Sequence, residues 1–151
     1  ESPGYFEEFM EFWSARKEVR QIWMSIFTPQ LGATDVEILS PEVREKFINS
    51  MTELRERFPK LLFPDRVANG YREPPRSPEE CIFSRTTLNY TADLKSKVTP
   101  CQFGGTPGCS QCGCMASSGL AAVGNYKLLN IVPVRSIFNI SDRIGKAVGS
   151  G

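Results

Sequence analysis

The chain has 151 residues, 40% of them hydrophobic, so it is long enough to bury the core of one domain. Its 18 basic and 17 acidic residues leave a net charge of +1, which provides no broad cationic field for nucleic acid. No apolar run approaches the roughly 20 residues that cross a bilayer. We therefore expect a soluble protein that binds neither nucleic acid nor membrane.

The first third of the chain alternates helical and extended patterns. Residues 2–16 place aromatic side chains at helical spacing, and residues 19–28 are β-rich and apolar, as in a strand covered on both faces. A second helix is predicted from the cap residue Ser40 to just before Pro59, and residues 61–63 form a short apolar strand. This rhythm is typical of an α/β layer with parallel strands. Two strands do not make a stable sheet, so we expect a piece of a larger barrel.

The middle of the chain leads into the cysteine-rich part. Residues 64–78 carry scattered arginines and prolines and are interpreted as a linker. A cap signature at residues 77–80 predicts a short helical turn that delivers Cys81. Residues 86–94 alternate apolar and polar side chains as a half-buried strand, and the chain then turns back toward Cys101. The resulting β-hairpin brings the two cysteines to the same end.

Two helices are predicted in the last part of the chain. Residues 115–123 are rich in small side chains, which lets a helix approach the cysteine-rich loop closely before Gly124 ends it. A final helix begins at Pro133 and carries an apolar stripe as far as Val148, so we expect it to dock on the body of the protein. The Gly-Ser-Gly at 149–151 is interpreted as a remnant added to the native chain.

Five cysteines are the main functional signal, four of them in a glycine-rich loop. They are Cys81, Cys101, Cys109, Cys112 and Cys114. Such a loop can fold several sulfurs around one metal centre. Disulfides are disfavoured because the count is odd, because Cys112 and Cys114 would close a strained ring, and because no signal sequence starts the chain. We therefore expect reduced thiols, a metal site and a cytoplasmic protein.

The ligand set restricts the metal, because the chain contains no histidine. A four-cysteine zinc site and an iron–sulfur cluster both remain, since each accepts four thiolates. Structural zinc usually uses two separate Cys-x-x-Cys pairs, whereas this chain has one, Cys109 and Cys112, with single cysteines upstream. The spacing favours an iron–sulfur cluster over zinc. Catalysis by Ser/His/Asp or Cys/His groups is excluded by the missing histidine.

The order Cys81, strand, turn, Val-Thr-Pro-Cys101 and then Cys109-x-x-Cys112 resembles the auxiliary-cluster module that follows the barrel in many radical SAM enzymes. This module is of the SPASM type or the shorter twitch type. In the twitch form, two cysteines flank a hairpin and a later Cys-x-x-Cys completes one [4Fe-4S] cluster. The resemblance implies that Cys81 and Cys101 are the hairpin ligands and Cys109 and Cys112 the pair. Cys114 is then the spare cysteine and the alternative ligand.

The resemblance also implies a division of the chain. Residues 1–66 would be the closing part of a radical SAM partial barrel, of α/β class. Residues 67–124 would be a small α+β cysteine-rich module with a β-hairpin, and residues 125–148 would contain the C-terminal docking helix. The Cys-x-x-x-Cys-x-x-Cys motif that holds the catalytic cluster of these enzymes is not in this sequence.

We therefore expect the N-terminal barrel portion to be a missing partner, and S-adenosylmethionine to bind only to a full-length enzyme. The expected role is that of an auxiliary cluster in an oxidoreductase, either transferring electrons or positioning the substrate. The alternative is a non-enzymatic interaction domain stabilised by four-cysteine zinc. The sequence does not identify the substrate.

Overall fold

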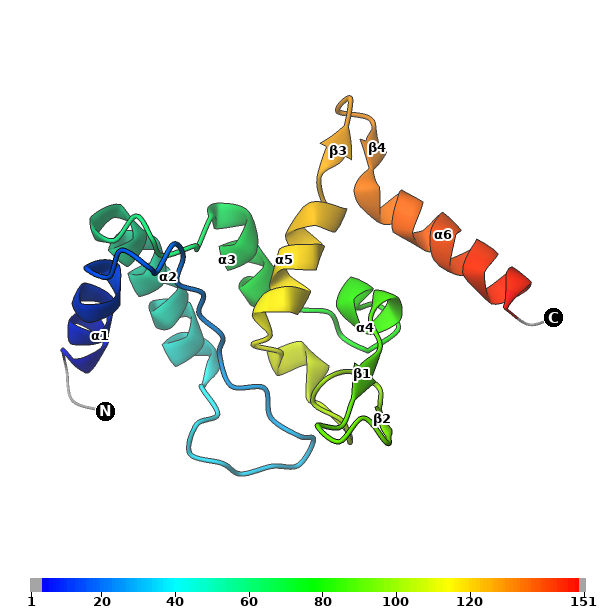
Figure 1. The fold of residues 1–151 in the computed structure, drawn as a ribbon, viewed down its shortest axis with the longest axis horizontal. Coiled ribbons are helices and arrows are strands. Elements are labelled where there is room, and N and C mark those ends of the chain that lie inside the picture. The colour runs from blue at the N-terminus through cyan, green and yellow to red at the C-terminus, as the bar shows by residue number, and fades with distance from the viewer. Residues whose placement is uncertain (1–3, 150–151) are drawn as a thin grey trace.

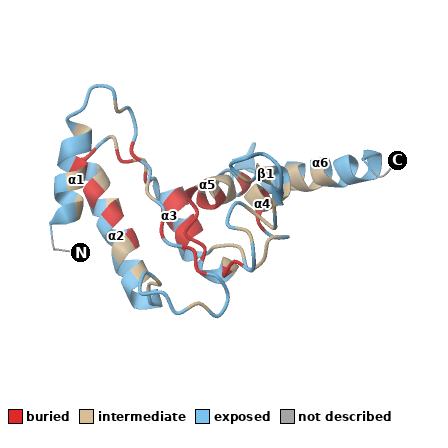
Figure 2. Cartoon of the chain, turned by 60° about the horizontal axis from the view of Figure 1, so that its bottom comes forward, coloured by how far each residue is buried: buried red, intermediate tan, exposed pale blue. Residues whose placement is uncertain are grey.

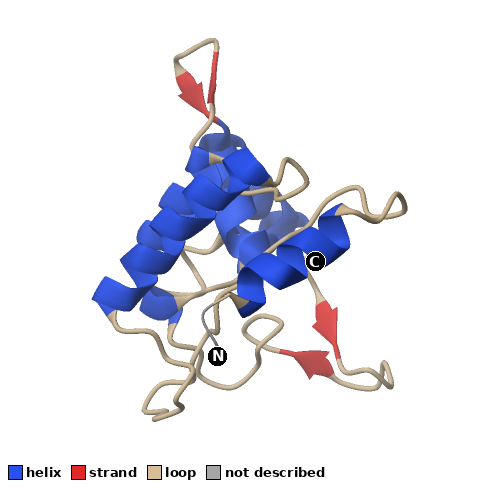
Figure 3. Cartoon of the chain, turned by 90° about the vertical axis from the view of Figure 1, so that its left-hand side faces the viewer, coloured by secondary structure: helices blue, strands red, loops and turns tan. Residues whose placement is uncertain are grey.

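Short helices joined by long connections form the protein, which a computed structural model describes at residues 4–149 (Figure 1). The described residues form six α-helices, one short 3₁₀ helix and two small antiparallel sheets, so the coarse class is α+β. Figure 3 shows the helices grouped together and both hairpins at the periphery. In chain order the elements are α1 (Tyr5–Ser14), α2 (Pro41–Arg57), α3 (Asp65–Arg72), α4 (Ile82–Thr86), β1 (Asn89–Tyr90), β2 (Lys97–Val98), η1 (Cys109–Gln111), α5 (Met115–Gly124), β3 (Lys127–Leu128), β4 (Val132–Pro133) and α6 (Val134–Val148).

Helices α1 and α2 confirm the two helices predicted in the first part of the chain. The Ser40 hydroxyl accepts a hydrogen bond from the Val43 N–H at 3.3 Å, which caps α2, and α2 ends before Pro59. Met10 of α1 and Ile48 of α2 are fully buried in the shared core. The part of the first predicted helix before residue 4 lies outside the described residues.

The two predicted parallel strands shorten to a single bridge. Ile22 and Leu61 pair in parallel, the Ile22 N–H donates to Lys60 O at 2.8 Å, and the Leu62 N–H donates to Ile22 O at 2.9 Å. The parallel direction is therefore correct, but the described residues contain no longer parallel strand. A partial barrel is not visible in this arrangement and stays a proposal.

The same extended segment pairs with the cysteine-rich loop further along. The Ile26 N–H donates to Gly113 O at 2.9 Å, and Gln30 forms an antiparallel bridge with Pro107. The cysteine-rich loop therefore satisfies some of the backbone hydrogen-bonding groups of the extended segment. At those positions the segment does not need a neighbouring parallel strand. The loop is held against the N-terminal half of the chain.

The prediction of a linker over residues 64–78 is wrong at its first half. Helix α3 begins after Pro64, and its Val67, Ala68 and Tyr71 are buried. These side chains recur at helical spacing, but the prolines and arginines around them dominated the sequence pattern. Helix α3 packs against both α2 and α5, so it is a central part of the core (Figure 2).

The hairpin before the cysteine loop is confirmed but is shorter than expected. Strands β1 and β2 are antiparallel, and α4 occupies the start of the strand predicted at residues 86–94. The Thr86 and Thr87 hydroxyls donate to the carbonyls of Ile82 and Phe83 at 2.8 and 2.6 Å, so both side chains bond the backbone of α4 and not a partner strand. The expected helical turn also lies later in the chain: α4 follows Cys81, which is its N-cap.

Helices α5 and α6 confirm the two predicted C-terminal helices, and the β3–β4 hairpin between them was not predicted. Helix α6 extends away from the other helices and contains no buried residue (Figures 1 and 2). Its docking on α4 is polar, because Arg85 donates to Asn139 and Asp142, both at 2.8 Å. Residues 150–151 of the expected remnant lie outside the described residues. Among the described helices, none has the length and apolarity to cross a membrane.

Candidate metal centre

All five cysteines line one cavity, although Cys81 is far from the others in the sequence. Three of them, Cys81, Cys112 and Cys114, are buried, while Cys101 and Cys109 are partly exposed. The cysteine-rich loop, α4 and α5 meet at this point. The structure thus brings together every cysteine that the sequence analysis selected.

The fold gives each cysteine a distinct local position. Cys81 precedes α4 and Cys114 precedes α5, so both lie at the N-terminal ends of helices. Cys109 begins the 3₁₀ helix η1 and Cys112 directly follows it, while Cys101 follows the β1–β2 hairpin. The exposed N–H groups of a helix start favour negative charge, which suits a thiolate.

Three of the sulfurs accept hydrogen bonds, and that of Cys112 accepts from the Thr28 hydroxyl at 4.0 Å. Cys81 Sγ accepts from the Ser84 N–H at 3.5 Å and lies 3.3 Å from the Ser117 hydroxyl. Cys114 Sγ accepts from Gln102 Nε2 at 3.1 Å and from the Ser117 N–H at 3.4 Å. Hydrogen bonds of this kind orient metal-binding sulfurs and tune the reduction potential of iron–sulfur clusters.

The ionisation of the thiols is strongly coupled. Burial, followed by the negative charges of Cys112, Cys101 and Cys81, raises the pKa of Cys109 to about 11. These four are the ligands that the sequence analysis selected. Burial also raises the pKa of Cys112 and Cys114. Without a cation between them, Cys109, Cys112 and Cys114 therefore keep their protons at neutral pH.

Apolar side chains line the same cavity. They belong to proline and phenylalanine residues, namely Pro75, Pro78, Phe83, Phe103 and Pro107. An apolar surround limits the access of water to a metal centre and controls its reduction potential.

Whether a metal fits depends on the size of the cavity and on the arrangement of the sulfur atoms around it. The cavity has room of ≈ 20 Å³, which is about the space that one water molecule needs. Among residues 4–149, no three cysteine or acidic side chains are placed so that they hold a single ion. The thiols are gathered but not arranged as a finished coordination shell. The donor set fits a thiolate-bound metal, whereas the final arrangement has to form when the metal binds.

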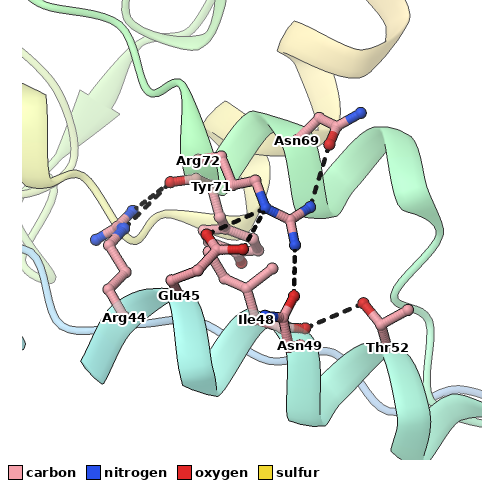
Figure 4. A network of polar contacts seen from close by, with 8 residues as sticks. All are labelled: Arg44, Glu45, Ile48, Asn49, Thr52, Asn69, Tyr71 and Arg72. Carbon is pink, nitrogen blue, oxygen red and sulfur yellow. Dashed lines mark hydrogen bonds and ion pairs between the residues drawn. The ribbon is translucent and has the colours of Figure 1, made fainter. Parts of the chain in front are cut away.

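Arg44 of α2 was missed by the sequence analysis. Its guanidinium donates to the carbonyl oxygens of Gln111 and Cys112 at 3.0 and 2.5 Å. It also donates twice to Tyr71 O, at 3.0 and 3.1 Å, and Figure 4 shows these two bonds. One signal in the sequence could have identified Arg44. It lies near the start of the predicted helix, where the helix dipole favours acidic side chains, so a basic residue there indicates another partner.

Thr28 was also missed. Its hydroxyl accepts from the Gly113 N–H at 2.9 Å and lies 4.0 Å from Cys112 Sγ. It therefore fixes the loop between two cysteines from the extended segment.

Comparison with known proteins adds nothing to this geometry. No family model, no curated protein and no solved structure matches the chain.

Proposed function

We propose that the protein binds an iron–sulfur cluster of the [4Fe-4S] type through the thiolates of Cys81, Cys101, Cys109 and Cys112. The observation that carries this proposal is that Cys81 and the four cysteines of the glycine-rich loop line one cavity. After the larger effect of burial, the charges of Cys112, Cys101 and Cys81 raise the pKa of Cys109, which supports a shared site for these sulfurs. The cluster would supply electron transfer or hold a substrate in position.

The other residues of the site have supporting roles. Ser84 and Ser117 orient the Cys81 sulfur, and Thr28 fixes the loop at Gly113. Cys114 is the alternative ligand, because its sulfur also faces the cavity while it caps α5. The apolar prolines and phenylalanines keep water from the centre.

The chain is proposed to act as the auxiliary-cluster portion of a radical SAM enzyme. The cysteine order supports this role, as does the hairpin that separates Cys81 from Cys101. The parallel bridge between Ile22 and Leu61 is compatible with the end of a partial barrel. Exposed Trp23 and Phe27 on the same segment are compatible with further structure beside it. Because this sequence lacks the motif that binds the catalytic cluster, the chain alone is expected not to cleave S-adenosylmethionine.

The test is anaerobic reconstitution of the full chain with iron and sulfide, and separately with zinc. We expect a brown protein with about four irons per chain and broad visible absorption. Replacement of Cys101, Cys109 or Cys112 by alanine is expected to remove the iron. Full iron content in any one variant shows that this ligand is wrongly assigned. A colourless protein that takes up zinc and no iron overturns the cluster and supports the zinc-stabilised interaction domain.

A further inference from the structure

One side chain connects three parts of the chain at the candidate centre. Arg44 leaves α2 and reaches the carbonyl oxygen of Tyr71 at the end of α3 and those of Gln111 and Cys112 in the cysteine loop. The guanidinium group is a rigid, planar set of donors. Its four hydrogen bonds to three backbone carbonyl oxygens therefore fix the positions of these carbonyls relative to one another. The cysteine loop is thereby attached to the helical core beside Cys112.

The charge of Arg44 is not used in an ion pair. All four of its hydrogen bonds end on carbonyl oxygens, and the salt bridges of the described residues involve other basic side chains. Four thiolates carry four negative charges, more than a 2+ ion or cluster core neutralises. A partly buried cation beside one of them offsets part of the excess.

We infer that Arg44 is a positioning residue of the metal centre, which holds Cys112 in place for the metal and compensates the charge of the thiolates. This inference rests on the proposed function. Arg44 does not touch the metal; it acts through the backbone of Cys112 and through its charge. Residues that orient metal ligands in this way typically change metal affinity 10- to 100-fold when they are replaced.

Arg72 offers a matched control. It also bridges α2 and α3, bonding Glu45 at 2.9 Å and Asn49 at 2.7 Å, but it makes no hydrogen bond to the cysteine loop (Figure 4). Its replacement removes a similar surface network without touching Cys112. A difference between the two variants therefore reports on the loop and not on general packing of α2 against α3.

The experiment uses the full chain with its metal, as wild type, Arg44→Gln, Arg44→Lys and Arg72→Gln. The rate of metal release into excess chelator is measured, together with the free energy of unfolding with and without metal. We expect release to be about 10- to 100-fold faster in Arg44→Gln, less than tenfold faster in Arg44→Lys, and within about twofold of wild type in Arg72→Gln. In Arg44→Gln the stabilisation gained on metal binding is expected to shrink.

The outcomes separate this inference from the proposed function. A wild type that takes up no metal overturns the proposed function, and the role of Arg44 with it. A wild type that holds metal no more tightly than Arg44→Gln overturns only the role of Arg44. Equal loss of stability in the metal-free and metal-bound forms of Arg44→Gln also overturns it, because a merely structural role has that effect. Arg44→Lys retains the charge and most of the volume of the side chain. If Arg44→Gln does not fold, the rate of metal release from Arg44→Lys is compared with that of wild type instead.

Discussion

Gly70 of α3 lies directly against Ser118 of α5. A Cβ atom added at residue 70 would be 2.9 Å from the carbonyl oxygen of Ser118 and 3.0 Å from its Cα. The opposing atoms belong to backbone, so they cannot turn aside as a flexible side chain does. This contact sets the distance between α3 and α5, and α5 begins at the candidate centre with Cys114 as its cap.

Replacement of Gly70 by alanine is therefore expected to push the two helices apart. The free energy of unfolding should fall by about 1–3 kcal/mol, which is typical of overpacking a core. The measurement is urea unfolding of the metal-free chain.

Gly119→Ala provides the control for that substitution, because residue 119 lies in α5 and has open space around its Cβ position. Alanine is the better helix former, so this variant should gain about 0.5–1 kcal/mol. If Gly70→Ala is as stable as Gly119→Ala, the close contact does not set the helix distance.

A second prediction concerns the glycine between Cys112 and Cys114. A Cβ atom at Gly113 would lie 2.0 Å from the carbonyl oxygen of Ile26, and the two residues also share a backbone hydrogen bond. Gly113→Ala must therefore move the cysteine loop off the extended segment. We expect a loss of about 3 kcal/mol or more in the metal-free protein, together with loss of metal binding.

The Gly145→Ala variant serves for comparison, since nothing lies within 4 Å of the Cβ position in α6. It should bind metal as the wild type does. Full metal content in Gly113→Ala would show that the loop can form the site without its contact to Ile26.

The local elements of this fold could be predicted from local signals. Ser40 followed by Pro41 marks the start of α2, and Gly124 marks the end of α5. The hairpin between Cys81 and Cys101 follows from alternating side chains and a polar turn. Each of these signals acts within a few residues, so no knowledge of tertiary structure is required.

The long-range contacts could not be predicted in the same way. Nothing in the sequence around Ile26 indicates that its N–H pairs with Gly113, because a backbone hydrogen bond carries no side-chain signature. The role of Arg44 has the same origin, since its three acceptors are carbonyl oxygens. Helix α3 was missed because the prolines on either side of it and its arginines outweighed the short apolar pattern of Val67, Ala68 and Tyr71.

A third prediction follows from the raised pKa of Cys109. In the unfolded chain a thiol ionises near pH 8.5, whereas folded Cys109 keeps its proton to about pH 11. Between these values the unfolded state binds fewer protons, so the free energy of unfolding falls as the pH rises. The metal-free, reduced protein should therefore lose stability above about pH 8.5, with no contribution from this group at pH 7.

Thermal unfolding from pH 7 to 11 measures this effect in wild type and in Cys109→Ser. The variant lacks the thiol at this position, so its stability should decline less steeply over that range. Parallel curves for the two proteins would mean that Cys109 ionises alike in the folded and unfolded states.

The last prediction separates Cys81 from Cys114 as the fourth ligand. Both sulfurs face the cavity and both cap a helix, so the other hydrogen bonds that they make distinguish them. Cys114 Sγ accepts from Gln102 Nε2 at 3.1 Å, a bond within its own loop. We therefore expect Cys81→Ser to bind substoichiometric metal, whereas Cys114→Ser retains the full amount. Both variants replace a thiol cap by a serine hydroxyl, which is itself a favoured N-cap, so stability alone should change little and similarly in the two. Metal content per chain after anaerobic reconstitution and desalting is the measurement. Full metal in Cys81→Ser together with loss in Cys114→Ser would reverse the assignment and make Cys114 the ligand.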